Sequence, residues 1–114
     1  MEIELIAKRV TRDYLRNIAL HRFGDLLKAV IDVERRVMAV GGELHADEEQ
    51  MLLDGGSLQK NLWGINLYPN MMDEAWIEFD SMINLRPSQG NRSRGVDDAS
   101  LRRQIVEIVQ MLTE

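Results

Sequence analysis

The 114-residue chain contains no cysteine, which excludes disulfides, thiolate metal sites and thiol nucleophiles. Aromatic residues make up only 5% of it, so few side chains could stack on nucleic-acid bases. No apolar run approaches the roughly 18 residues that a membrane-spanning helix needs. The first residues are acidic where a secretory signal would be basic. We therefore expect a cytoplasmic protein, with no membrane partner, whose core alone stabilises the fold.

The charge balance is acidic, with a formal net charge of -5. This charge argues against general nucleic-acid binding. The hydrophobic content of 45% and the charged content of 29% are typical of a globular protein. The length fits one domain over residues 1–114.

Local patterns predict both strands and helices. Strands are expected over residues 3–7, 26–33, 37–40, 62–68 and 76–85, where residues are β-branched or alternate between apolar and polar. Thr11 is expected to cap a first helix that stops at Gly24. A short helix over residues 47–53 is predicted to begin with Asp47 as N-cap and Gln50 in a capping box. Asp97 or Asp98 is expected to cap the last helix.

The resulting order, β-α-β-β-α-β-β-α, contains hairpins in place of regular βαβ crossovers. It predicts an α+β fold with a mainly antiparallel sheet and helices largely on one face. Because side chains alternate along a strand, one face of the last two strands is apolar and the other is polar. The residues expected on the polar face are Asn66, Glu78, Asp80, Asn84 and Arg86.

The loop of residues 86–95 has no carboxylate, although the whole chain is acidic. It combines two glycines, which can expose backbone amides, with arginines, whose planar donors suit phosphate or carboxylate. We predict that this loop binds an anionic small molecule. The donors expected to bind it are Arg86, Gln89, Asn91, Arg92 and Arg94.

Two other interpretations of the loop remain open. It can be purely structural, with its donors used by internal backbone groups and surplus carboxylates. The protein would then be a partner-binding module or a homodimer, with Met71, Met72 and Trp76 as an adaptable apolar contact.

A third interpretation is a metal-assisted hydrolase. His45 lies among four carboxylates at residues 43, 47, 48 and 49, and Asp80 follows Glu78 on the expected polar face. His45, Asp47 and Asp80 are the candidate metal ligands, since imidazole and carboxylate both bind divalent cations. Their spacing matches no dedicated metal motif, however, and acids are also expected at a helix start because of the helix dipole.

Three strings cover much of the chain: GGELHAD at residues 41–47, LWGINLYP at 62–69 and EFDSMINLRPSQGN at 78–91. With them the sequence resembles a family of small bacterial proteins classed as a domain of unknown function. The resemblance implies no activity, cofactor or catalytic residue. Nucleotide-binding glycine motifs and a nucleophile elbow are absent from the sequence, so no cofactor is indicated.

Overall fold

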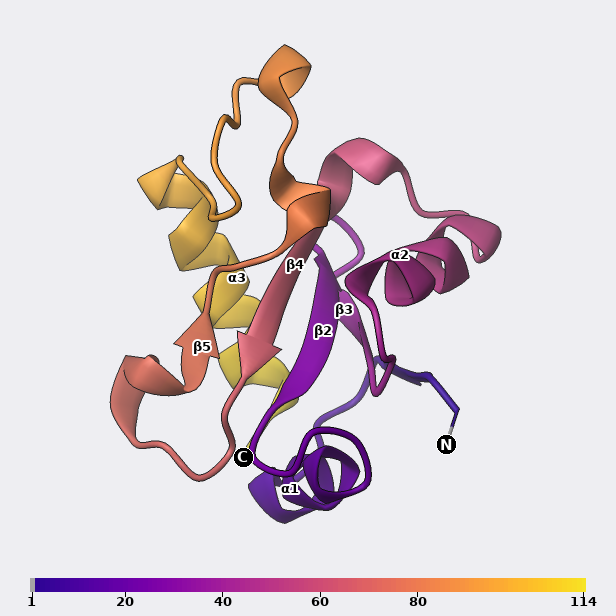
Figure 1. Cartoon of the computed structure of the whole chain (residues 1–114), viewed down its shortest axis with the longest axis vertical. Coiled ribbons are helices and arrows are strands. Elements are labelled where there is room, and N and C mark those ends of the chain that lie inside the picture. Colours follow the sequence, from indigo (N-terminus) through magenta and orange to yellow (C-terminus); the bar gives the residue numbers. More distant parts are fainter. Residues whose placement is uncertain (1) are drawn as a thin grey trace.

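The computed structural model describes residues 2–114, and it has the α+β fold and the element order expected from the sequence. Five strands, β1 (Glu4–Ile6), β2 (Leu27–Asp32), β3 (Val37–Val40), β4 (Leu62–Leu67) and β5 (Ile77–Glu78), form one sheet. Its strand order is β1-β3-β2-β4-β5, and every neighbouring pair is antiparallel. Three α-helices, α1 (Arg12–Leu20), α2 (His45–Asp54) and α3 (Ala99–Leu112), surround the sheet (Figure 1).

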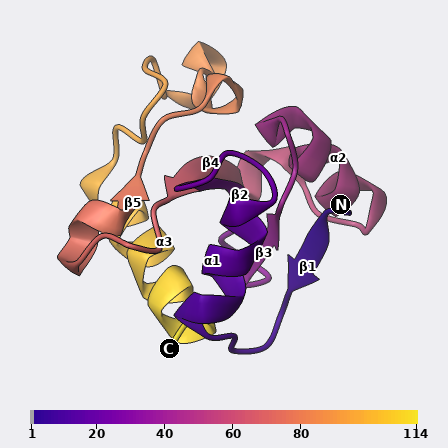
Figure 2. The same cartoon turned by 60° about the horizontal axis from the view of Figure 1, so that its bottom comes forward.

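The two faces of the sheet have separate cores. Leu15 and Ile18 of α1 and Ile105 of α3 pack with Ala29 and Ile65 on one face. Leu52 of α2 packs on the other face in a smaller cluster. The large core is therefore on the side of α1 and α3, while α2 covers part of the face that was expected to be polar. Figure 2 shows α1 in front of the sheet.

Most of the expected element ends are confirmed. The Thr11 side chain accepts from Tyr14 N and caps α1, and the Asp98 side chain accepts from Ser100 N and caps α3. The β2–β3 turn has no glycine because Asp32 Oδ1 accepts from the amides of residues 34 and 35 at 2.9 Å each, and Arg36 adopts a positive φ of 59°.

The predicted start of the second helix was wrong by two residues. Helix α2 begins at His45, with Leu44 as its N-cap, so Asp47 lies in the first turn. Gln50 donates forward to Asp54 Oδ1 at 2.8 Å and forms no capping box. Asp47 is still favoured there by the positive end of the helix dipole, which explains why the acidic run indicated a helix start.

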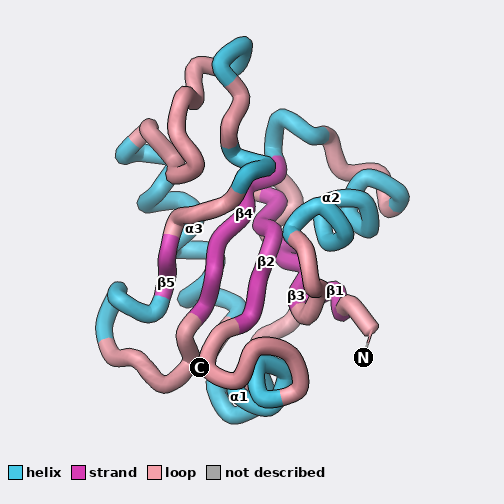
Figure 3. Tube along the Cα trace, in the orientation of Figure 1, coloured by secondary structure: helices cyan, strands magenta, loops and turns pink. Residues whose placement is uncertain are grey.

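The strand expected over residues 76–85 was also wrong for most of its length. β5 ends at Glu78, and the chain continues through loops and short 3-10 turns at Met82–Asn84 and Pro87–Gln89 until α3 begins (Figure 3). Ser81 caps the first of these turns by accepting from Ile83 N. The apolar residues that alternate over residues 76–85 therefore lie partly in β5 and partly in the loop and 3-10 turn that follow it, and not in one strand.

Candidate functional site

The loop of residues 86–95 uses most of its donors to hold itself together. The Arg86 guanidinium donates to Gln59 O at 2.6 Å and Leu62 O at 2.5 Å, and it stacks 4.1 Å from the centroid of the Trp63 ring. Burial lowers the pKa of Arg86 from its ordinary value. Gln89 Nε2 donates to Lys60 O at 2.8 Å. These two side chains tie the loop to the segment before β4.

Asn91 is the centre of the second half of the loop. Its Nδ2 donates to Asn84 O and Gly95 O at 2.8 Å each, and its Oδ1 accepts from Asp97 N at 2.8 Å. Because this buried side chain is hydrogen-bonded on both sides, it shapes the backbone and has little capacity left for a ligand.

A carboxylate of the protein itself, that of Asp97, accepts from two exposed donors of the loop. Asp97 Oδ2 accepts from Arg92 N at 2.8 Å, and Asp97 Oδ1 accepts from Ser93 Oγ at 2.5 Å. The hydrogen bonds from Ser93 and then from Arg92 lower the pKa of Asp97, which favours its ionised form. These two donors of the loop are thus used by Asp97.

Arg94 differs from the other predicted donors because it faces a cavity of about 410 Å³. Its Nε lies 2.8 Å from Asp80 Oδ1, and its side chain remains 56% exposed. The cavity lies between the start of α2, the segment of residues 80–83 and the residues around the start of β2. It is lined by Phe23, Leu26, Lys28, Leu44, His45, Ala46, Asn66, Asp80, Ser81, Met82, Ile83 and Arg94.

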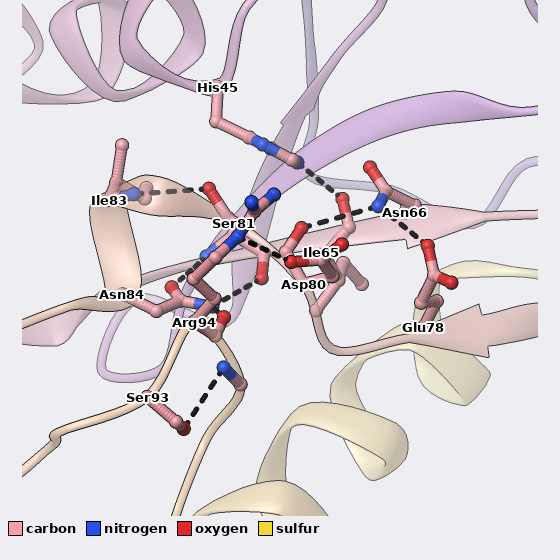
Figure 4. Close-up of polar contacts among 12 residues, drawn as sticks. His45, Ile65, Asn66, Glu78, Asp80, Ser81, Ile83, Asn84, Ser93 and Arg94 are labelled. Carbon is pink, nitrogen blue, oxygen red and sulfur yellow. Dashed lines mark hydrogen bonds and ion pairs between the residues drawn. The ribbon is translucent and has the colours of Figure 1, made fainter.

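His45 forms one wall of this cavity and is only 7% exposed. Its Nε2 lies 2.7 Å from Ile65 O (Figure 4). A carbonyl oxygen can only accept, so Nε2 carries the proton and Nδ1 carries the lone pair. Burial is the main factor that lowers the pKa of His45, and the charges of Lys28 and Arg94 add to it, while the Ile65 bond and Asp80 oppose it. The imidazole is therefore neutral at neutral pH.

Gly64 makes this arrangement possible. A Cβ at this position would lie 2.6 Å from Ser81 Oγ and 3.2 Å from His45 Cδ2. Only glycine lets Ser81 and His45 approach β4 so closely.

Two residues of the expected polar face, Asn66 and Asp80, line the cavity, and the other three do not. Asn66 Nδ2 donates to Glu78 Oε1 at 2.9 Å and to Asp80 O at 3.2 Å. Asn84 is instead fully buried, and Arg86 folds back toward Leu62 O. Because β5 ends at Glu78, the prediction that these five residues share one strand face was wrong for Asp80, Asn84 and Arg86, which all follow the strand.

Lys28 is the site residue that sequence reasoning missed. It pairs in register with Asn66 across β2 and β4 and lies 5.4 Å from the centroid of the Phe23 ring. Within residues 2–114 no carboxylate lies at ion-pair distance from its ammonium group. The signal was present in the sequence, since Lys28 is the one charged residue among the apolar residues 26–31.

The acidic cluster around His45 separates in the structure. Asp47 is exposed, whereas Glu48 turns inward and its Oε2 accepts from Gly42 N at 2.9 Å. Burial raises the pKa of Glu48 to about 9, so this carboxyl is protonated at neutral pH. Among residues 2–114, no group of three or more histidine, aspartate or glutamate side chains is placed to hold a metal ion.

The apolar contact considered for a homodimer is only partly exposed. Met72 and Met71 are 78% and 45% exposed, but Trp76 is 3% exposed. The Arg12 guanidinium covers the Trp76 ring at 3.7 Å and donates to Met71 O at 3.1 Å. Trp76 is therefore a core residue held under an arginine.

Fold and cavity together define a small α+β domain with a half-open, mixed polar and apolar pocket at the start of α2. The chain belongs to the family described as "Protein of unknown function (DUF5674)", whose sequence model matches residues 4–112. No curated protein and no solved structure matches the chain. Within the described residues, no helix has the length and apolar character needed to cross a membrane.

Proposed function

We propose that the protein binds a small anionic molecule in the cavity between α2 and residues 80–83. The observation that carries the proposal is the charge of the lining. Two cations, Lys28 and Arg94, face one carboxylate, Asp80, which leaves one positive charge in a chain whose net charge is -5. Asp80 is already paired with Arg94, so the Lys28 ammonium is the group left for a ligand anion.

Helix α2 adds a second favourable contribution. Its N-cap is Leu44, which provides no side-chain hydrogen bond to the first-turn amides. The residues of that first turn, His45 and Ala46, line the cavity. Free amides and the positive end of a helix dipole both favour a bound anion.

The rim of the cavity is apolar. Phe23, Leu44 and Met82 are 44%, 56% and 63% exposed. Large apolar side chains that gather around a pocket with a few polar groups are typical of sites for small organic ligands. The ligand therefore has an apolar part that covers these side chains and an anionic part that reaches Lys28.

In this proposal the predicted donors of loop 86–95 have different roles. Arg94 contacts the ligand, whereas Arg86, Gln89 and Asn91 hold the loop that carries Arg94. Arg92 has an exposed side chain outside the cavity lining and serves as a reference position.

The test is a thermal-shift and calorimetric screen with inorganic phosphate, sugar phosphates, nucleotides and aliphatic carboxylates. We expect at least one of these anions to raise the melting temperature of the wild-type protein, because ligands stabilise the state that binds them. The Lys28→Met and Arg94→Gln variants should lose this effect, and Arg92→Gln should keep it. Equal responses in all four proteins, or no response to any anion, would overturn the proposal.

A further inference from the structure

The cavity contains an uncommitted hydrogen-bond acceptor on His45. Nε2 is used by Ile65 O, while Nδ1 has no hydrogen-bond partner among the described residues. His45 lines the cavity, and its Nδ1 is not among the fully buried polar atoms that lack a partner, so Nδ1 keeps some exposed surface. A neutral imidazole nitrogen with a lone pair can only accept, so it calls for an N–H or O–H donor on the ligand.

Asn66 provides a second acceptor at the inner end of the cavity. Its Nδ2 is fully used by Glu78 Oε1 and Asp80 O, and Figure 4 shows its oxygen turned away from Glu78. Oδ1 is buried and has no partner, and the residue as a whole is 9% exposed. A buried acceptor left without a donor is unfavourable, so a ligand that donates to it gains affinity.

The charge of the lining also limits the anion. Its single excess positive charge matches a monoanion, such as a carboxylate, better than a phosphate dianion, which would leave one negative charge uncompensated in a partly buried site. The apolar rim of Phe23, Leu44 and Met82 adds the requirement for an apolar chain.

From these groups, and resting on the proposed function, we infer the ligand class: an aliphatic or aromatic carboxylate that also carries a hydroxyl group. The carboxylate pairs with Lys28, and the hydroxyl group donates to His45 Nδ1 or Asn66 Oδ1. The apolar chain covers the rim.

Three probes of nearly equal size test this inference by calorimetry on the wild-type protein. They are 2-hydroxy-4-methylpentanoate, its deoxy analogue 4-methylpentanoate, and leucine. We expect the deoxy acid to bind about tenfold more weakly than the hydroxy acid, because it leaves the acceptors unpaired. Leucine is a zwitterion without net charge, so we expect it to bind more weakly than the hydroxy acid at a site with one excess positive charge.

Two variants assign the effect to His45. The side chain in His45→Gln can still donate to Ile65 O from the Nε2 position but has no acceptor at Nδ1. The side chain in His45→Asn keeps an amide group near the Nδ1 position and loses the Ile65 bond. We expect His45→Gln to reduce the preference for the donor-bearing ligand to about onefold to threefold, and His45→Asn to retain part of it.

The outcomes separate the two proposals. If all three probes bind equally and lose affinity in Lys28→Met, the inferred ligand class is wrong and the anion site stands. If none of the three probes binds but phosphate or a nucleotide does, the inferred ligand class is again wrong and the anion site stands. If no anion binds at all, both are wrong. A donor preference that survives in His45→Gln overturns the assignment to Nδ1.

Discussion

The side-chain amide of Asn84 takes the place of a neighbouring strand for Gly64. Its Oδ1 accepts from Gly64 N at 2.8 Å, and its Nδ2 donates to Gly64 O at 2.9 Å. Nδ2 also donates to Arg94 O at 2.9 Å. The buried Asn84 side chain thus pairs with the Gly64 backbone at the edge of β4. It also connects this edge to Arg94, which faces the cavity. This explains how the chain can leave the sheet after two residues of β5 without leaving buried backbone groups unpaired.

Replacing Asn84 by alanine should therefore destabilise the protein strongly. The change removes three hydrogen bonds and leaves buried donors and acceptors of Gly64 without partners, so we expect a loss of about 2–4 kcal/mol in the free energy of unfolding. Urea denaturation measures this loss. Asn70→Ala is the control, because Asn70 is an exposed residue that accepts from Arg16 Nε, and its loss should stay within about 0.5 kcal/mol. Equal midpoints for the two variants would contradict the role given to Asn84.

The Gly64→Ala variant tests the close packing beneath the cavity. The added methyl group would lie 2.6 Å from both Cβ and Oγ of Ser81, so the segment of residues 80–83 or His45 must move. We expect a loss of about 1–3 kcal/mol and a weaker ligand response, because overpacking forces a backbone shift. Gly55→Ala is the control, since its nearest contacts would be 3.5 Å away and its φ of -85° suits alanine. A neutral Gly64→Ala would show that the close approach has no structural importance.

Much of the fold could be predicted because its signals are local. Thr11 and Asp98 cap their helices through bonds to residues two or three positions away, and the apolar run before Asp32 forms the expected hairpin. The end of β5 could not be predicted in this way. It depends on contacts between Asn84 and Gly64, which are 20 residues apart, and no local pattern reveals which asparagine will bond to a distant strand.

The candidate site was likewise predictable only where its residues carry a local signal in the sequence. Arg94, His45 and Asp80 were each noted from the sequence for separate reasons, and the structure brings them to one cavity. The contribution of Lys28 depends on the pairing of β2 with β4, which places it beside Asn66. The arginine loop suggested an anion site because it lacks acids, but Asp97 is only a few residues away and accepts from Arg92 N and Ser93 Oγ.

Glu48 should make the stability of the protein depend on pH. Burial raises its pKa in the folded state to about 9, whereas the ordinary value is 4.5. Between these two values the folded state binds one more proton than the unfolded state, so the free energy of unfolding falls as pH rises. The stabilising contribution of the protonated Glu48 carboxyl is fully present below the unfolded-state pKa of 4.5. It is lost as pH rises from there through the folded-state pKa of about 9.

The variant Glu48→Gln should remove this dependence. Glutamine keeps an acceptor for Gly42 N and has no charge to bury, so we expect it to be more stable than the wild type by at least about 1 kcal/mol at pH 8, with a smaller difference at pH 5. Urea denaturation across this range measures the difference. Glu107→Gln, an exposed change on α3, should show no such trend. A constant difference between Glu48→Gln and wild type at all pH values would mean that Glu48 is ionised in the folded protein.

Arg86→Lys should separate the structural role of the loop from binding. Lysine cannot reproduce the two simultaneous bonds to Gln59 O and Leu62 O or the planar stacking on Trp63. We expect a loss of about 1–3 kcal/mol in stability, since a partly buried charged donor pair is removed. The affinity of any ligand found in the screen should change less than about threefold at a temperature where the variant is folded, because Arg86 does not line the cavity. Arg92→Lys, which is exposed in the same loop, should alter neither quantity. If Arg86→Lys instead weakens binding by tenfold or more and leaves stability unchanged, the anion site lies on the loop itself and not in the cavity beside α2.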